Sequence, residues 1–73
     1  MIEVEIQTSK NGKVFRIVKD HPIYPIFTIE YLKVYEGDKE SIDVWLAATT
    51  PANKVFGSLV EAQMELCKLL LEN

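Results

Sequence analysis

Few side chains in this chain of 73 residues could support catalysis. The chain has one cysteine and one histidine. A nucleophilic cysteine needs a positive neighbour or a helix N-terminus to stabilise its thiolate, but Cys67 lies late in an apolar C-terminal segment. His21 lies in a proline-containing segment that reads as a loop, where it has no second histidine to work with. We therefore expect a buried structural thiol and a solvated histidine, and no catalytic residue.

The acidic residues between the third and fourth predicted strands suggest a cation site only superficially. Their spacing lacks the oxygen ligands and the closing glutamate of an EF-hand loop, so an exposed acidic hairpin tip is the simpler interpretation. Zinc-type clusters, glycine-rich phosphate loops and nucleophile elbows are missing from the sequence. We therefore predict a protein that is not an enzyme and has no metal or cofactor. The acidic residues concerned are Glu36, Asp38, Glu40 and Asp43.

Basic and aromatic residues offer a different kind of chemistry. Basic side chains beside exposed rings bind single-stranded nucleic acid, and each stacked base contributes about 1 to 3 kcal/mol. Against this use, Glu3, Glu5 and Asp43 are predicted on the same sheet face as the rings and would repel phosphate. The residues for such a site are four cations on one predicted hairpin, Lys10, Lys13, Arg16 and Lys19, with the rings of Tyr31, Tyr35 and Trp45.

The same rings also suit a protein interface, where tyrosine, tryptophan and arginine are common anchors. We predict a partner-binding surface made of Arg16, Tyr31, Tyr35 and Trp45. A third interpretation is that Tyr31 and Trp45 form a cross-strand pair that only stabilises the sheet.

Length and charge limit the alternatives. A chain of this size forms one domain, residues 1 to 73, and buries only about 60% of its unfolded surface, so it gains from oligomerisation. The net charge of −3 opposes indiscriminate binding to phosphate backbones. The N-terminus does not resemble a signal peptide, and no apolar run approaches the roughly 20 residues that cross a bilayer. We therefore expect a cytoplasmic protein.

The C-terminal segment from Ser58 to Asn73 predicts an amphipathic helix. Ser58 and Glu61 have the spacing of a capping box, which marks the helix start. The apolar residues spread over about 220° of the helix, whereas a surface helix needs a stripe of only somewhat more than about 100°. The excess predicts a homodimer, with Gln63, Met64, Cys67 and Leu71 at its interface. Gln63 also needs a hydrogen-bond partner, which is nearby backbone, solvent at an edge, or the same amide across a two-fold axis.

Two hairpins precede this helix. Residues 2 to 8 alternate in strand period, and Asn11-Gly12 favours a two-residue type I′ turn that places Thr8 opposite Phe15 and Ile6 opposite Ile17. Residues 26 to 35 and 41 to 49 predict the second hairpin, in which Tyr31 lies opposite Trp45.

The loop of residues 20 to 25 contains two prolines and separates the hairpins. Residues 50 to 54 read as a turn or as a helix start, and we favour the turn, followed by a short extended Val55-Phe56 along the fourth strand.

These elements predict an α+β fold, a four-stranded antiparallel sheet, or five-stranded with the short extended segment, packed by one C-terminal helix in the order ββββα. We assign the helix-covered face to Ile2, Val4, Ile6, Phe15, Ile17, Leu32, Val34, Ile42, Val44 and Leu46. We assign the solvent face to Glu3, Glu5, Val14, Arg16, Val18, Phe27, Ile29, Tyr31, Lys33, Tyr35, Asp43 and Trp45.

The order of four strands and a helix resembles that of the positive-cofactor-4 type of dimeric single-stranded-DNA-binding proteins, in element order alone. Our leading hypothesis is a non-enzymatic adaptor, inhibitor or regulatory subunit that recognises another protein through the aromatic sheet face or the apolar helix. The alternative is a dimer that binds single-stranded nucleic acid through the basic hairpin and the sheet aromatics.

Overall fold

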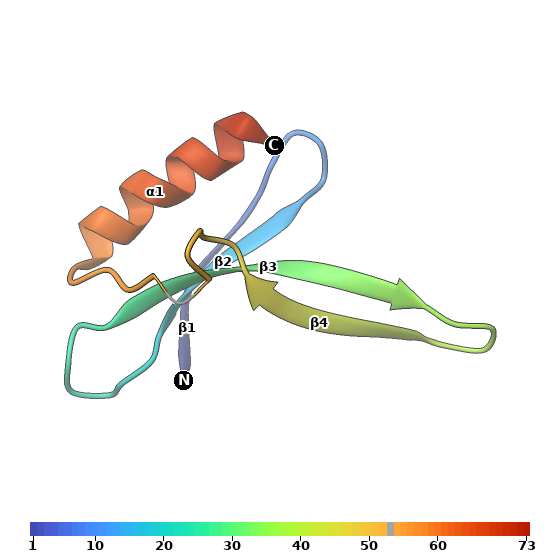
Figure 1. Cartoon of the computed structure of the whole chain (residues 1–73), viewed down its shortest axis with the longest axis horizontal. Helices are drawn as coiled ribbons and strands as arrows, with labels where there is room; N and C mark the ends of the chain where they lie inside the picture. The colour runs from blue at the N-terminus through green and yellow to red at the C-terminus, as the bar shows by residue number, and fades with distance from the viewer. Residues whose placement is uncertain (53) are drawn as a thin grey trace.

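A computed structural model describes residues 1–52 and 54–73 and has the predicted α+β fold in the order ββββα. The four antiparallel strands lie in the order β1-β2-β3-β4, and α1 packs on one side of the sheet (Figure 1). The helix begins and ends within one residue of the predicted limits. The elements are β1 (Ile2–Thr8), β2 (Val14–Lys19), β3 (Phe27–Glu36), β4 (Ser41–Ala47) and α1 (Leu59–Glu72).

The turn between β1 and β2 is longer than the predicted type I′ turn. The Gly12 amide donates to the Ser9 carbonyl at 2.9 Å, and the Ser9 amide donates to the Lys13 carbonyl at 2.8 Å. Gly12 has a φ of 87°, while Asn11 stays at negative φ, so this is a type I turn followed by a left-handed glycine. Ile6 therefore lies opposite Arg16, and the predicted pairing of Ile6 with Ile17 is wrong by one residue.

β1 also contains a β-bulge that the sequence did not indicate. Glu3 lies opposite Val18 and Glu5 lies opposite Ile17, so Val4 has no counterpart on β2. A bulge reverses the side on which the following residues point. Ile2 and Glu5 consequently lie on the helix-covered face, whereas Glu3 and Ile6 lie on the other face. The predicted shared face of Ile2, Val4 and Ile6 is wrong.

The second hairpin is also shifted by one residue. Its loop has four residues, 37 to 40, closed by the Gly37 amide donating to the Glu40 carbonyl at 2.8 Å. Tyr31 lies opposite Leu46, and Leu32 lies opposite Trp45. Paired residues of antiparallel strands share a face, so Tyr31 and Trp45 point to opposite sides. The predicted Tyr31–Trp45 pair is therefore wrong.

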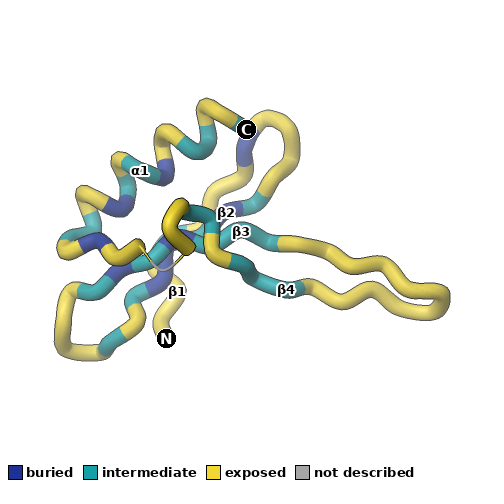
Figure 2. The backbone as a smooth tube through the Cα atoms, in the orientation of Figure 1, coloured by how far each residue is buried: buried dark blue, intermediate teal, exposed yellow. Residues whose placement is uncertain are grey.

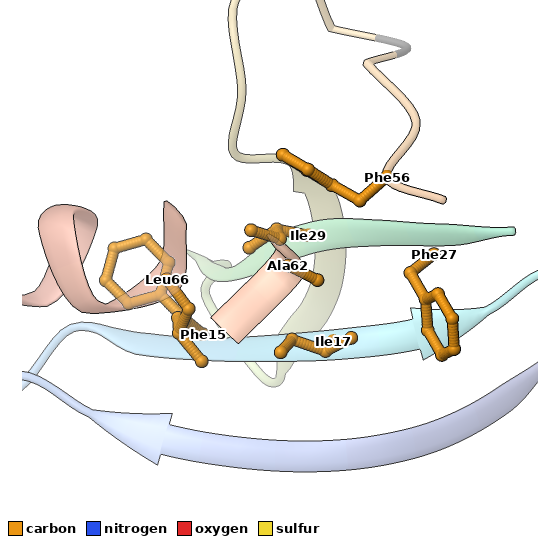
Figure 3. Close-up of a cluster of buried hydrophobic side chains, with 7 residues drawn as sticks. All are labelled: Phe15, Ile17, Phe27, Ile29, Phe56, Ala62 and Leu66. Carbon is orange, nitrogen blue, oxygen red and sulfur yellow. The ribbon is translucent and has the colours of Figure 1, made fainter. Parts of the chain in front are cut away.

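The core lies between α1 and the face of β2 and β3 that it covers (Figure 3). Phe27 and Ile29, predicted on the solvent face, are buried here, whereas Leu32 and Val34, predicted in the core, lie on the opposite face. This exchange is the direct result of the register shift, because side chains alternate along a strand. The buried cluster contains Phe15, Ile17, Phe27, Ile29, Phe56, Ala62 and Leu66.

The capping box at the start of α1 forms as predicted. The Ser58 hydroxyl accepts from the Glu61 amide at 3.2 Å, and the Glu61 carboxylate accepts from the Gly57 amide at 3.3 Å. At the other end, Asn73 donates to the Leu69 carbonyl through both its backbone amide, at 3.1 Å, and its side-chain amide, at 2.8 Å. Both ends of the helix therefore have partners for groups that the helix itself leaves unpaired.

The segment before α1 pairs with β3 and not along β4. Phe56 and Phe27 exchange backbone hydrogen bonds of 2.8 and 3.0 Å, so the chain crosses beyond the end of β4. The predicted extended segment along the fourth strand is wrong in its pairing. The turn favoured for residues 50 to 54 includes Asn53, which lies outside the described residues; on either side of it, the Lys54 amide donates to the Pro51 carbonyl at 3.1 Å.

The distal half of the second hairpin extends away from the core. We call residues 33 to 43 the arm, and every residue in it is exposed (Figures 1 and 2). The radius of gyration is 12.9 Å, against about 11 Å for a compact domain of this length. The arm therefore contributes little to the core of the single chain.

The extension of the arm away from the core predicts different costs for the same truncation at two positions on the helix side of the sheet. Ile17 is 0% exposed in the core, and Ile42 is 57% exposed in the arm. Ile17→Ala should lower the free energy of unfolding by about 2 to 5 kcal/mol, because it leaves a cavity. Ile42→Ala should lower it by less than about 1 kcal/mol. Urea denaturation at one protein concentration measures both, and equal losses would contradict the exposed position of the arm.

Candidate interaction surface

The sheet face opposite α1 is not covered by the helix, and we call it the outer face. The strand pairings place apolar side chains from all four strands on it, around charged residues at its centre. Of its apolar members, Ile6 and Val34 are exposed, and Val14, Leu32 and Trp45 are half-buried. An uncovered sheet face of this composition is available for contact with another molecule.

Arg16 is the centre of the outer face. Its Nε and Nη2 atoms each lie 2.8 Å from Oε1 of Glu30, and its Nη1 lies 3.6 Å from Oε1 of Glu3. The guanidinium carbon lies 4.0 Å from the centroid of the Trp45 ring. Arginine over a tryptophan ring is the best geometry for a cation–π contact, worth about 0.5 to 2 kcal/mol. Arg16 therefore joins two carboxylates and the only tryptophan of the chain.

The strand pairings explain this arrangement. Arg16 and Glu30 are directly opposite on β2 and β3, a position in which opposite charges attract across strands. Trp45 lies on β4, on the far side of β3, and its large ring reaches back over the guanidinium. Val18, two residues along β2 from Arg16, is fully buried although it lies on the outer face. The centre of the outer face is thus a packed layer and not a loose set of surface side chains.

The four predicted partner-binding residues do not share a face. Arg16 and Trp45 meet on the outer face, whereas Tyr31 and Tyr35 lie on the helix side of the sheet. Tyr31 packs against the core, and Tyr35 is exposed on the arm. The prediction of one aromatic surface is therefore wrong, because it rested on a register shifted by one residue.

The predicted basic residues are also divided between the faces. Lys13 Nζ lies 4.6 Å from the centroid of the Tyr31 ring, on the helix side, and Lys19 pairs with Phe27 on the same side. Arg16 lies on the outer face with two carboxylates, and Lys10 is in the turn. The hairpin thus carries four cations without forming one positive surface.

Gln63 has a partner within its own chain, which the sequence did not reveal. Its Nε2 donates to Oε1 of Glu5 at 2.9 Å, across from α1 to β1. The three partners considered from the sequence did not include this one, because Glu5 was assigned to the opposite face. The donor of this amide therefore does not need an amide across a two-fold axis.

The other predicted dimer residues, Met64, Cys67 and Leu71, are exposed. The expectation of a buried Cys67 thiol is wrong for the single chain, because this side of α1 points away from the sheet. Val60 is exposed on the same side of the helix and was not selected from the sequence.

His21 and the acidic residues have structural or exposed positions. His21 is half-buried, and its Nδ1 accepts from the amides of Ile23 and Tyr24 at 3.1 and 3.3 Å, so the ring organises its own loop. The acidic residues of the arm tip are exposed, as predicted. Across residues 1–52 and 54–73, no group of three or more histidine, cysteine or acidic side chains is placed to hold a metal ion. The described helix is too short and too polar to cross a membrane.

Comparison of the chain with protein-family models, curated proteins and solved structures returned no significant match.

The contact between Arg16 and Trp45 has a direct optical test, because the chain has one tryptophan. Arg16→Ala should shift the fluorescence emission of Trp45 to longer wavelength, since the ring loses its cover and gains contact with water. Lys19→Ala, which removes a cation of the same hairpin from the other face, should leave the spectrum unchanged. An identical spectrum for wild type and Arg16→Ala would show that the guanidinium does not cover the ring.

Proposed function

We propose that this chain is a small, non-enzymatic binding module that recognises another protein through its outer face. An adaptor, an inhibitor and a regulatory subunit all need such a surface and no catalytic group. The observation that carries this proposal is the position of Trp45, held against Arg16 on a sheet face that the helix does not cover. Tryptophan and arginine are the residues most enriched among those that dominate binding energy.

The outer face is already organised for binding. Arg16 is fixed by Glu30 and Glu3, so its side chain and the Trp45 ring lose little conformational freedom when a partner arrives. Ile6 is exposed on the edge strand β1 and Val34 is exposed on the arm, and both extend the apolar area of this face. Binding to a surface that is ordered before contact costs less conformational entropy, so more of the contact energy appears as affinity.

The charges around the outer face indicate the chemistry of the partner. Glu3 and Glu30 lie on this face beside Arg16, Asp43 lies on the same face in the arm, and the exposed arm tip adds further carboxylates. Complementary interfaces place opposite charges at their rims. We therefore expect a partner with an apolar patch bordered by lysine or arginine.

The second hypothesis, a single-stranded nucleic-acid-binding protein, has less support from this arrangement. Stacking of bases needs rings and cations on one surface. Here Arg16 is already paired with carboxylates, and Lys13 and Tyr31 lie on the other side of the sheet, beside the core. The outer face also carries more carboxylates than cations, which opposes contact with phosphate.

The proposal predicts that capture of a partner depends on the outer face and not on aromatic residues in general. The chain is immobilised on a solid support and incubated with native cell extract, and the bound proteins are then quantified. Trp45→Ala should lower recovery of the specific partner at least about tenfold, because a central aromatic anchor typically contributes that much or more. Tyr35→Ala, which removes an exposed ring from the other side of the arm, should leave recovery unchanged.

A second variant and a salt series make this test decisive. Ile6→Lys changes the outer face without removing the ring, and circular dichroism verifies that both outer-face variants fold. Capture should persist at high salt, since an apolar interface depends little on ionic strength. Equal recovery by wild type, Trp45→Ala and Ile6→Lys would refute the proposal. Binding of a labelled single-stranded oligonucleotide that weakens steeply with salt and is lost in Arg16→Glu would favour the second hypothesis.

A further inference from the structure

One side of α1 carries an exposed apolar stripe. We define the stripe as Val60, Met64, Cys67 and Leu71; the first, second and fourth of these are 64%, 65% and 81% exposed, and Cys67 is also exposed. At about 100° per residue the four side chains fall within about 60° of one another. The core uses a different side of the helix, that of Ala62 and Leu66. The stripe is therefore not needed for packing within the chain.

The single chain exposes more surface than its mass requires. Its accessible surface is 5153 Å², whereas a compact folded monomer of 8.4 kDa exposes roughly 4600 Å². The exposed arm, the edge strand β1 and the stripe all contribute to this excess. An excess of several hundred Å² per chain is comparable to a large part of one partner's share of a standard interface, about 800 Å².

The spacing of the stripe indicates which molecule covers it. The intervals between its members are four, three and four residues, the pattern by which two helices pack side by side along a seam. This pattern reads the same in both directions. A two-fold axis requires a surface that is complementary to itself, and a palindromic seam meets that requirement when the two helices are antiparallel.

The charges beside the stripe fit the same arrangement. Glu61 and Lys68 are seven residues apart, so they lie on the same flank of the stripe, and both are exposed. In an antiparallel pair of helices this flank faces its own copy with the direction reversed. Glu61 then lies near Lys68 of the partner subunit, and Lys68 lies near the partner subunit's Glu61. Glu61 and Lys68 therefore form two opposite-charge pairs across the seam, while the exposed Glu72 of the same flank adds a carboxylate at each end.

From the stripe and these charges, we propose that the occupant is a second copy of the chain, packed antiparallel along α1. Val60 contacts Leu71 of the partner subunit, and Met64 contacts Cys67 of the partner subunit, with the reciprocal contacts generated by the two-fold axis. The Gln63–Glu5 hydrogen bond places β1 on the neighbouring side of the helix. The outer face is on the other side of the sheet and stays free, so this inference does not rest on the proposed function.

Cysteine cross-linking tests both the partner and the register. In a Cys67→Ala background, Val60→Cys and Leu71→Cys are introduced together, and the protein is oxidised at micromolar concentration. These positions are eleven residues apart, about 16 Å along one helix, so they cannot join within a chain. We expect a disulfide-linked dimer in which peptide mapping finds position 60 joined to position 71 of the partner subunit.

The single variants are the matched controls. In the antiparallel register, position 60 lies about 16 Å along the seam from position 60 of the partner subunit, and the same holds for position 71. Val60→Cys alone and Leu71→Cys alone, each with Cys67→Ala, should therefore stay uncross-linked. Cross-linking by the single variants to the same extent as by the double variant would overturn the antiparallel register.

Sedimentation of the reduced wild-type chain tests the assembly without any substitution. We expect a dimer whose dissociation constant rises at least about a hundredfold in Met64→Asp, because a buried charge without a partner is costly at a seam. Lys68→Glu and Glu61→Lys should each weaken the homodimer, and a mixture of the two should form the heterodimer, in which opposite charges meet again. A wild-type monomer at all concentrations would overturn the proposal, as would a stripe that is covered only when a different protein is added.

Discussion

The length of each hairpin turn decides which side chains this sheet buries. Side chains alternate along a strand, so one extra residue in a turn exchanges the two faces of everything that follows. The left-handed conformation of Gly12 adds that residue in the first turn, and the four-residue loop from 37 to 40 sets the second. The first turn places Glu5 and not Ile6 opposite Ile17, and the second places Leu32 and not Tyr31 opposite Trp45 on the outer face.

Element order and limits follow from local features of the sequence. The apolar alternation of residues 2 to 8, the Asn-Gly pair, and the spacing of Ser58 and Glu61 each act within a few residues, and the strand, the turn and the helix start lie at the predicted places, although the turn is one residue longer than predicted. The resulting α+β fold is therefore the part of the structure that can be predicted best from the sequence.

The register between the strands could not be predicted from such local features. Asn-Gly suits two turns that differ by one residue, and the shorter one gave apolar pairs such as Ile6 with Ile17. The observed register places Ile6 opposite Arg16, a poor pair by itself. On the other side of β2, Ile17 lies opposite Ile29 and Arg16 lies opposite Glu30. These pairings of β2 with β3 span a proline-containing loop, so no local turn rule fixes them.

The composition of the candidate site depends on the strand register. Arg16 and Trp45 were both selected from the sequence, and they do meet, but Tyr31 and Tyr35 were placed with them only through the shifted pairing. The bulge at Val4 and the bond between Gln63 and Glu5 had no counterpart in the sequence patterns. Contacts between elements far apart in the chain are the part of this site that single-sequence reasoning does not reach.

Two surfaces on opposite sides of the sheet result from this packing. The outer face combines a tryptophan ring with a guanidinium fixed by carboxylates, and the apolar stripe of α1 has a spacing suited to its own copy. Because the sheet and its core separate the two surfaces, contact at one does not obstruct the other. A small chain of this kind can self-associate through its helix while it presents its outer face to another protein.

The register can be tested most directly by nuclear Overhauser effects from the Trp45 indole protons. The account predicts strong effects to the side chains of Arg16 and Leu32 and none to the ring of Tyr31, which lies across the sheet. Effects between Trp45 and Tyr31 without any to Arg16 would contradict the register, and with it the composition of the outer face.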